Sequence, residues 1–543
     1  MRTRAEVSRD KLRGGFYSPD LLVDICLERS KELLTGCNDL RVLEPSAGNG
    51  AFLKGLHRSR LSRDVKHVEA VELLETEAVE ADRVLGDLSL PGRVLNENIL
   101  HWAHGQSATF DLVLANPPYV RFQFISEEDK HRARKISTEL GVAGSSVSNL
   151  WISVFLLSLA KLREGGVFSV ILPTEFLTGV SANAVRNWLL TNTTNLSIDL
   201  FQPGSFPAVL QEVLILSGRR LQHSARSSTI TFHDHNGGTR TWKHKVAPGA
   251  GTWTGFLLPP VQYDALEAVA GISAFSQLGT VAKFSVSTVT GANSYFCVSS
   301  EEVREYLLHD WVLPLLPRSR HAQGLMFSKE EHEALAGQGE VAWLLHFSAD
   351  RPSPTSRAKS SSYLDLGLRQ NIDQRFKCRV REPWYRVPVV QPGDLLLSKR
   401  SNRYPRVIAN HASVVTTDTI YKGQMLPGAS ITADDFTAVF HNSITMLSAE
   451  IEGRSFGGGV LELVPSEVSA LQVPVIAGAG AEIARLDQLS RTSKDPDSLI
   501  ETTDEILVKL LPELDSATMS ELSEARHTLM ARRLLRAQPK FYG

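Results

Sequence analysis

The sequence predicts an α/β protein whose first part is a mostly parallel, doubly wound sheet. Short apolar runs alternate with helix-like stretches over residues 1–220, the alternation stops near 221, and helical patterns return after 476. Strands that alternate with helices form parallel sheets covered by helices on both faces. At 543 residues the chain is also too long for one core. We therefore expect an α/β domain over 1–220, a mixed α+β domain over 221–475 and a helical C-terminal segment over 476–543.

The first domain is expected to contain seven strands with helices between them. The strands are expected at 41–44, 67–73, 93–95, 110–115, 167–172, 196–200 and 212–216. The helices are expected at 19–35, 50–60, 74–85, 149–163 and 180–191. The segment 123–148 is long for a loop and carries the charge run EEDKHRARK, which suits either a functional loop or a solvated, partly helical insertion.

Composition narrows the class of protein. The chain is 42% hydrophobic, and 58 Lys and Arg residues balance 60 Asp and Glu residues, so a polyanion-binding surface must arise from local clustering. The four cysteines lack CxxC spacing, which argues against a disulfide framework and a zinc site. No apolar run is long enough to span a membrane, and the N-terminus lacks the apolar core of a signal peptide. We expect a cytoplasmic protein that uses neither a metal nor a membrane.

The stretch FDLVLANPPYVRF, residues 110–122, ends a buried strand in an unusual way. Pro117 and Pro118 lack the N–H groups that a sheet ladder needs, so the chain must leave the sheet here in a fixed direction. Taken alone, this pattern also fits a rigid turn in which Asn116 is an ordinary turn residue. The preceding motifs decide between the two interpretations.

The stretch RVLEPSAGNGAFL, residues 41–53, places Glu44 at a strand end before a loop of small residues and a helix. Small residues let backbone N–H groups and a helix N-terminus approach a ligand carboxylate, and Glu44 can meet a ligand ammonium. S-adenosylmethionine carries both groups at its amino-acid end. Glu72 ends the next expected strand, where an acid commonly holds ribose hydroxyls. A tight strand-to-helix turn is the alternative for the glycine loop alone.

With that cofactor in place, the Asn116 turn has a chemical interpretation. The side-chain oxygen of Asn116 and the backbone carbonyl of Pro117 can accept the two N–H bonds of an exocyclic amine, and Pro118 fixes the direction of that carbonyl. The ring of Tyr119 offers a face on which a flat base can stack. Such a site works by positioning an in-line displacement and requires no metal.

These motifs, in this order, resemble those of the gamma-class amino-methyltransferases of DNA, mainly adenine-N6 enzymes of bacterial type II restriction-modification systems. The resemblance covers residues 13–220 well and implies a Rossmann-like S-adenosylmethionine-binding fold. It implies cofactor contacts from Ser18, Pro19, Glu44, Ser46, Gly48, Gly50, Glu72, Asn98 and Ile99. It implies catalytic roles for Asn116, Pro117, Pro118, Tyr119 and Phe206.

Asn98 departs from the family pattern, and Phe206 has a second interpretation. Asn98 stands where the family commonly has an acid that contacts the adenine amine of the cofactor, so this contact would lack charge; Ile99 would cover the ring face. Phe206, in GSFPAVLQEVLIL, is expected to stack on the flipped target base opposite Tyr119, whereas ordinary burial in the core is the alternative.

A basic stretch marks the second domain as the DNA-reading part. Residues 369–406 contain ten Lys and Arg against three Asp and Glu, with aromatic residues between them. Such clusters suit phosphate contact and base stacking, although solvated surface charge is the alternative. The flanking segments 285–299 and 455–474 resemble those that bracket the target-recognition domain of the family. The expected DNA contacts are Arg375, Lys377, Arg379, Lys399, Arg400, Arg403 and Arg406.

The sequence thus predicts a sequence-specific methyltransferase that binds double-stranded DNA as a monomer and methylates N6 of a flipped adenine. It would protect host DNA from a cognate restriction endonuclease that acts separately. Asn-Pro-Pro-Tyr motifs also occur in enzymes that methylate RNA or protein glutamine amides. A methyltransferase acting on cytosine N4, RNA or a protein amide therefore stays open, as does a non-catalytic DNA-binding subunit of a restriction complex.

Overall fold

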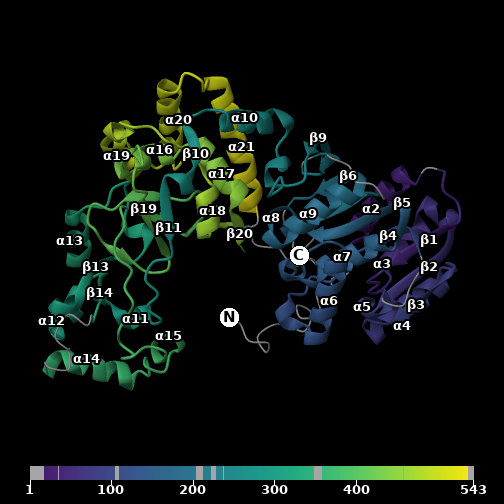
Figure 1. Ribbon diagram of the computed structural model, residues 1–543, viewed down its shortest axis with the longest axis horizontal. Coiled ribbons are helices and arrows are strands. Elements are labelled where there is room, and N and C mark those ends of the chain that lie inside the picture. The colour runs from purple at the N-terminus through teal and green to yellow at the C-terminus, as the bar shows by residue number, and fades with distance from the viewer. Residues whose placement is uncertain are drawn as a thin grey trace. The chain divides into compact units, whose positions relative to one another are not determined.

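The computed structural model describes residues 18–34, 36–103, 109–202, 212–221, 228–236, 238–347, 358–456 and 458–535. They form two compact units, which Figure 1 shows: unit 1 extends to Pro260 and unit 2 begins at Val261. The boundary follows residue 260 rather than the expected 220, because the strands at Ser228–Asp234 and Arg240–Val246 extend the sheet of unit 1. No helix of the described segments combines the length and apolar character needed to cross a membrane.

Unit 1 is built on a nine-stranded sheet of order β3-β2-β1-β4-β5-β7-β6-β8-β9. Its strands are β1 (Leu40–Glu44), β2 (Val65–Glu72), β3 (Gly92–Asn96), β4 (Phe110–Ala115), β5 (Leu162–Pro173), β6 (Thr193–Leu200), β7 (Val213–Arg220), β8 (Ser228–Asp234) and β9 (Arg240–Val246). The five strands from β3 to β5 are mutually parallel, whereas β7 runs antiparallel to both of its neighbours. The predicted mostly parallel, doubly wound sheet is confirmed.

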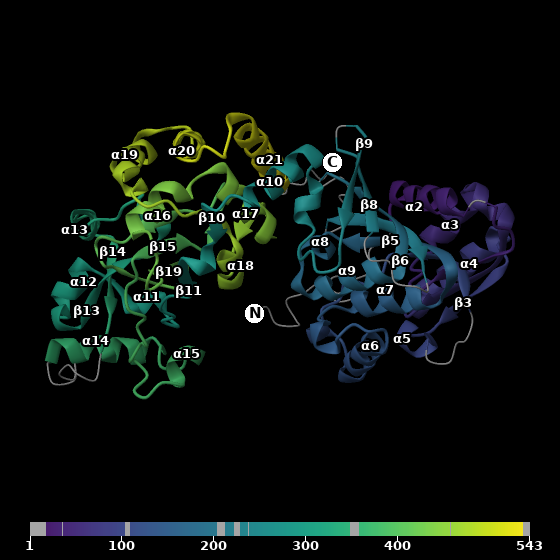
Figure 2. The ribbon, with the colours of Figure 1, turned by 45° about the horizontal axis from the view of Figure 1, so that its top comes forward.

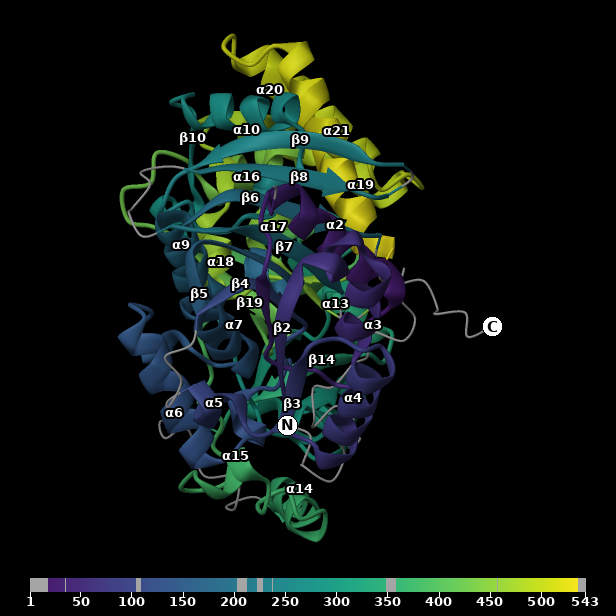
Figure 3. The same ribbon diagram turned by 90° about the vertical axis from the view of Figure 1, so that its right-hand side faces the viewer.

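Helices cover both faces of this sheet. They are α2 (Asp20–Leu33), α3 (Ala51–Arg58), α4 (Glu75–Asp87), α5 (Ile99–Trp102), α6 (Glu127–Glu139), α7 (Leu150–Ala160), α8 (Glu175–Thr178) and α9 (Val180–Asn192). Figure 3 shows α2, α3 and α4 on one face and α5, α7 and α9 on the other. Every strand and helix expected in this region is present, with ends that shift by a few residues.

The charged segment after β4 forms the helix α6. Ser126 accepts the Asp129 N–H as a cap, and Glu127, Glu128 and Asp129 occupy the first turn, where negative charge stabilises a helix. The helix α6 packs on α7, where Ser137 and Ser153 share a buried hydrogen bond of 3.0 Å. Since α7 is apolar on all sides, it needs a cover on the face that the sheet leaves open. The expected insertion is therefore a structural layer of unit 1.

Unit 2 combines small sheets with helices, as predicted. Its strands are β10 (Phe275–Gln277), β11 (Ala282–Ser285), β12 (Cys297–Ser299), β13 (Val312–Leu316), β14 (Val341–Leu345), β15 (Leu395–Ser398), β16 (Arg400–Ser401), β17 (Val407–Ala409), β18 (Val415–Thr416), β19 (Ile420–Met425), β20 (Arg454–Phe456), β21 (Val460–Glu462) and β22 (Gln472–Pro474). They form sheets of two to four strands, and all pairings except that of β13 with β18 are antiparallel.

The helices of unit 2 include those of the expected C-terminal segment. They are α10 (Pro260–Ala270), α11 (Asn293–Phe296), α12 (Ser300–Glu305), α13 (Lys329–Gly337), α14 (Ala358–Arg369), α15 (Phe376–Arg379), α16 (Ala433–Phe440), α17 (Ser443–Glu452), α18 (Pro465–Ala470), α19 (Ile483–Thr492), α20 (Ser498–Leu510) and α21 (Ser516–Leu534). Figure 2 shows α19, α20 and α21 at one end of unit 2, with α14 and α15 at the other.

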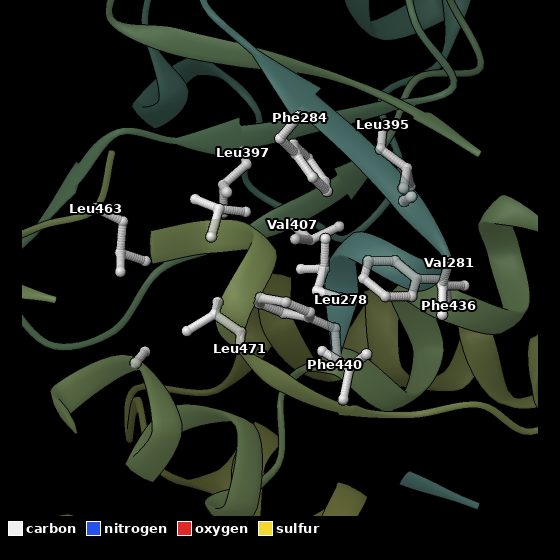
Figure 4. Packing of buried hydrophobic residues seen from close by; sticks show 14 of the residues in the cluster. Leu278, Val281, Phe284, Leu395, Leu397, Val407, Phe436, Phe440, Leu463 and Leu471 are labelled. Atoms are coloured by element: carbon white, nitrogen blue, oxygen red, sulfur yellow. The ribbon is translucent and has the colours of Figure 1, made fainter. Parts of the chain in front are cut away.

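One core cluster of unit 2 lies between the sheet of order β11-β19-β15-β17 and the helices. Figure 4 shows Phe284 and Leu395 from the strands facing Phe436 and Phe440 from α16. Ile500 of α20 belongs to the same buried cluster. The C-terminal helices are therefore packed as part of unit 2.

Candidate active site

The sheet edge formed by the carboxyl ends of β1, β2 and β4 gathers the candidate residues of unit 1. β1 pairs in parallel with β2 on one side and with β4 on the other. Glu44 ends β1, Glu72 ends β2, and Asn116 directly follows β4. The chain leaves β1 towards β2, so the strand order reverses between β1 and β4. Doubly wound sheets bind their ligands at such a switch point.

The loop between β1 and α3 is held close to the end of β2. The N–H of Ala47 donates to the carbonyl of Val71 at 3.0 Å, and the N–H of Gly48 donates to the Glu72 carboxylate at 2.9 Å. Gly48 has a φ of +52°, and Gly50, the residue before α3, has a φ of +78°. Glycine adopts these angles without steric cost. The helix α3 begins directly after this loop, and no described side chain caps it, so its amino end at this edge suits a ligand carboxylate.

Glu44 is the buried acid of this edge. Only 2% of its surface is exposed, and its Oε2 atom has no hydrogen-bond partner in the described part of the chain. Burial, and then the nearby charge of Glu72, raise the pKa of Glu44 well above its usual value of 4.5. A buried acceptor without a hydrogen-bond donor is unfavourable unless another molecule supplies that donor. A ligand ammonium would supply both the missing donor and a compensating charge.

Glu72 connects the loop to the next helix. One carboxylate oxygen accepts the Gly48 N–H, and the other accepts the N–H of Leu74 at 2.9 Å. An ionised carboxylate offers about four acceptor positions, so further donors such as ribose hydroxyls can still bind. The geometry therefore fits the expected ribose contact and adds a second function, the anchoring of the glycine loop.

The Asn116 side chain is oriented by two partners. Its Nδ2 donates to Ser18 Oγ at 3.1 Å, and its Oδ1 lies 2.9 Å from the Tyr119 hydroxyl. In addition, Ser46 Oγ donates to the Asn116 backbone carbonyl at 3.0 Å, which ties the turn to the glycine loop. Ser18 thus contacts the predicted catalytic residue, although the sequence suggested only a cofactor contact. Pro19, next to it, precedes the first residue of α2.

Tyr119 lies deeper than its predicted stacking role suggests. Its residue surface is 8% exposed, and its hydroxyl lies 3.0 Å from the Ile171 carbonyl as well as near Asn116. Burial raises the pKa of Tyr119 well above its usual range, so the hydroxyl keeps its proton. A single proton serves one acceptor at a time. The hydroxyl can therefore orient Asn116 Oδ1, a role that motif spacing does not reveal.

Asn98 is engaged within unit 1 by both ends of its amide. Its Oδ1 accepts the Leu100 N–H at 3.0 Å as the cap of α5, and its Nδ2 donates to Asp129 Oδ1 at 2.9 Å. Asp129 also accepts a hydrogen bond of 2.8 Å from Ser126. The Asp129 carboxylate is therefore hydrogen-bonded to Asn98, the residue at the position where an acid was expected. Sequence reasoning missed Asp129, because 31 residues separate it from Asn98. Ile99, next to Asn98, is buried.

Pro117 is buried and Pro118 is half-buried in the turn after β4. Phe206 lies outside the described residues. No group of three or more His, Cys, Asp or Glu side chains in the described ranges is arranged to hold a metal ion.

The basic residues predicted to contact DNA differ in their surroundings within unit 2. Lys399 and Arg400 lie 3.4 and 3.2 Å from Glu462, and Arg403 lies 3.7 Å from Asp497. Arg406 donates to the carbonyls of Gln323 and Gly324 at 2.9 and 2.7 Å, so its side chain serves the internal structure of unit 2. These bonds weigh against the DNA contact expected of Arg406, which stays a prediction.

The other three basic residues, Arg375, Lys377 and Arg379, are exposed around α15 and are here called the α15 basic cluster. They form no ion pair with any described residue. Their charge is thus directed to solvent, as a phosphate-binding surface requires.

Two family models match the chain. "Eco57I restriction-modification methylase" matches residues 62–206, and "Type II methyltransferase M.Eco57I, C-terminal domain" matches residues 250–508. Together they cover most of the sheet of unit 1 and most of unit 2.

Individual relatives match over most of their length. The type II methyltransferase M.AccI of Acinetobacter calcoaceticus is 22% identical over 79% of this chain and 79% of its own. The type II methyltransferase M.XamI of Xanthomonas campestris pv. amaranthicola is 22% identical over 80% of each chain. Among solved structures, the type IIL restriction-modification enzyme MmeI in complex with DNA is 12% identical, with a TM-score of 0.49 over 94% of this chain and 72% of that one.

Proposed function

The chain belongs to the Eco57I family of type II restriction-modification DNA methyltransferases, and from this premise we propose that it methylates the N6 amine of one adenine within a specific sequence of double-stranded DNA. The Asn116 amide, oriented by Ser18 and Tyr119 beside the glycine loop, carries the proposal. The modification would protect host DNA from a separate, cognate restriction endonuclease. We propose that the enzyme acts on DNA as a monomer.

The groups at the sheet edge fit S-adenosylmethionine. The unpartnered oxygen of buried Glu44 supports binding of the ammonium, and the uncapped amino end of α3 supports binding of the carboxylate. Glu72 retains acceptor positions for the ribose hydroxyls, while Asn98 and Ile99 are proposed to contact the adenine ring. When bound, the cofactor supplies a methyl group on a sulfonium centre. No metal contributes to this proposal.

The target amine is proposed to bind at the turn after β4. Asn116 Oδ1 has two lone pairs, so it can accept a hydrogen bond from the target amine. The Tyr119 hydroxyl, or the packing of the Asn116 amide, fixes the direction of this oxygen. The Pro117 carbonyl would accept the second N–H bond, and Pro118 fixes that carbonyl. Two acceptors on one amine make its nitrogen lone pair more available to the methyl group. These contacts position the reacting atoms, which is the main source of rate in an in-line displacement.

The base must leave the helix to reach this turn, because N6 of a stacked adenine is not accessible to chemistry. We propose that the accessible part of the Tyr119 ring and the side chain of Phe206 hold the flipped base on its two faces. The α15 basic cluster is proposed to contact phosphates, together with Lys399, Arg400 and Arg403. Phosphates would displace the acidic neighbours of these last three residues only in part.

The Asn116→Ala variant tests the proposal. Its single-turnover rate of methyl transfer to unmodified duplex DNA should fall by at least about a hundredfold, because one of the two amine acceptors is lost. DNA affinity should stay close to that of the wild type. Asn192→Ala, whose amide donates to Trp188 and Thr191 of α9, serves as the matched control and should retain its rate. Near-normal transfer by Asn116→Ala would overturn the proposed site.

A further inference from the structure

The short helix α15 carries the exposed aromatic side chain of Phe376. Its residue surface is 65% exposed, and Val380, directly after the helix, is 67% exposed. Burying a phenylalanine contributes about 2 kcal/mol, so a residue left this exposed forgoes that stabilisation in the free protein. The position is informative because α15 lies at the tip of unit 2 beside α14, as Figures 1 and 2 agree.

The backbone below Phe376 is held firmly in place. Cys378, two residues later, is fully buried in the core cluster that contains Tyr295. Arg381 donates to the carbonyls of Thr290 and Val289 at 2.7 and 2.8 Å. These contacts fix both the inner face of α15 and the segment after it. Phe376 is therefore presented by an anchored element, and its exposure is a feature of the fold.

Two cations flank the ring. Lys377 Nζ lies 5.7 Å from the ring centroid, and Arg379 Cζ lies 5.6 Å from it. Arg375 adjoins the ring in sequence, and none of the three cations forms an ion pair among the residues that the structure describes. An apolar protein partner would have to strip water from all three charges, which is costly without acidic partners. A polyanion whose units carry flat aromatic faces matches both features.

We propose that Phe376 stacks on a base of double-stranded DNA, inserting as a wedge while the α15 basic cluster binds the adjacent phosphates. Apolar side chains that enter a base step partly unstack it and bend the duplex, and stacking of a base on an aromatic residue is tolerant of sequence. The inference rests on the proposed function, because it requires duplex DNA as the substrate. It adds a contact that motif comparison does not assign, at the end of unit 2 remote from α19, α20 and α21 (Figure 3).

Stacking and phosphate contact differ in their dependence on salt, which makes the inference testable. The affinity of the full-length protein for a fluorescently labelled duplex would be measured by anisotropy between about 50 and 200 mM salt. Over this range, phosphate contacts make the affinity fall steeply with salt. Phe376→Ala should lower the affinity about tenfold at every salt concentration and leave the slope of log K against log salt unchanged. Arg379→Gln should reduce that slope by about 0.9, the contribution of one phosphate contact.

Val380→Ala is the matched control, because Val380 is equally exposed beside the same helix. It should bind like the wild type, and all three variants should keep the wild-type melting temperature. A duplex with 2-aminopurine at successive positions should show one site whose fluorescence depends on Phe376. Wild-type affinity in Phe376→Ala would overturn the stacking inference and leave the proposed function standing. Failure of the wild type to bind duplex DNA, or a preference for RNA or a protein, would overturn the proposed function itself.

Discussion

The Tyr119 hydroxyl lies 2.9 Å from the Oδ1 atom of Asn116. The tyrosine of the Asn-Pro-Pro-Tyr turn is thus in contact with the amide oxygen proposed to hold the target amine. On the other side, Ser18 fixes the nitrogen of the same amide. Tyr119 of the turn and Ser18 from a distant segment thus orient the amide that is proposed to be catalytic.

Replacing Tyr119 with Phe separates this orienting role from base stacking. The variant keeps the ring but removes the hydroxyl, so kcat should fall about tenfold while the Kd for S-adenosylmethionine stays near the wild-type value. The free energy of unfolding should fall by about 1 kcal/mol, because Asn116 Oδ1 and the Ile171 carbonyl lose the one donor that they share. Full activity in Tyr119→Phe would show that the ring alone matters at this position.

Glu44 should make both stability and cofactor binding depend on pH. Its pKa is raised in the folded protein, so the native state holds a proton that the unfolded chain releases near pH 4.5. The native state then binds more protons, and stability falls as the pH rises from this value towards the raised pKa. Glu44→Gln should therefore be at least as stable as the wild type at pH 7 in the absence of cofactor, as thermal unfolding would reveal.

The same substitution should weaken cofactor binding. An uncharged amide cannot pair with the ammonium, so the Kd for S-adenosylmethionine should rise at least about tenfold. In the wild type, binding should release a proton from Glu44, which calorimetry in buffers of different ionisation enthalpy measures. Glu28→Gln, at an exposed position of α2, is the control and should change neither quantity. Unaltered affinity in Glu44→Gln would remove Glu44 from the cofactor site.

Asp129 should act on the cofactor through Asn98. Its carboxylate accepts a hydrogen bond from Asn98 Nδ2. Asp129→Ala should therefore free the Asn98 amide to rotate. The KM for S-adenosylmethionine should rise about fivefold, with little change in kcat. In an Asn98→Ala background the same change should have almost no further effect, because the two residues act as a unit. Additive effects of the two substitutions would mean that Asp129 only stabilises α6.

The two groups of basic residues should differ in their effect on DNA binding. Replacing Arg375, Lys377 and Arg379 together with Gln should reduce the salt slope of DNA binding by roughly 2 to 3. Arg406→Gln should leave the slope unchanged and lower the free energy of unfolding by about 1–3 kcal/mol, because the Gln323 and Gly324 carbonyls lose their donor. The reverse pattern would place the phosphate-binding surface around Arg406.

Much of unit 1 could be predicted because the determinants are local. The alternation of apolar runs with helical patterns gave its strands, and the motifs at Glu44, Glu72 and Asn116 stand at the ends of three of them. Strands β8 and β9 could not be assigned to the sheet, since the paired residues of β6 and β8 lie 34 positions apart in the chain. The helix α6 was ambiguous, because its charge run also suits a solvated loop.

The fine structure of the site depends on contacts between distant segments. The bond from Asn116 to Ser18 spans 98 residues, and the one from Asn98 to Asp129 spans 31. Sequence spacing cannot reveal such partners, nor can it distinguish an exposed arginine from one that binds carbonyls. For that reason Arg406 resembled its neighbours in sequence but differs from the α15 basic cluster in structure.

The central claim is that the turn after β4 directs methyl transfer to adenine N6 in DNA. The most direct test incubates the protein with labelled S-adenosylmethionine and unmodified bacterial genomic DNA, digests the product to nucleosides and maps the modified sites by sequencing. We predict N6-methyladenine at one recurring sequence, and its absence with Asn116→Ala. Label in N4-methylcytosine, or no label in DNA despite cofactor binding, would contradict the claim.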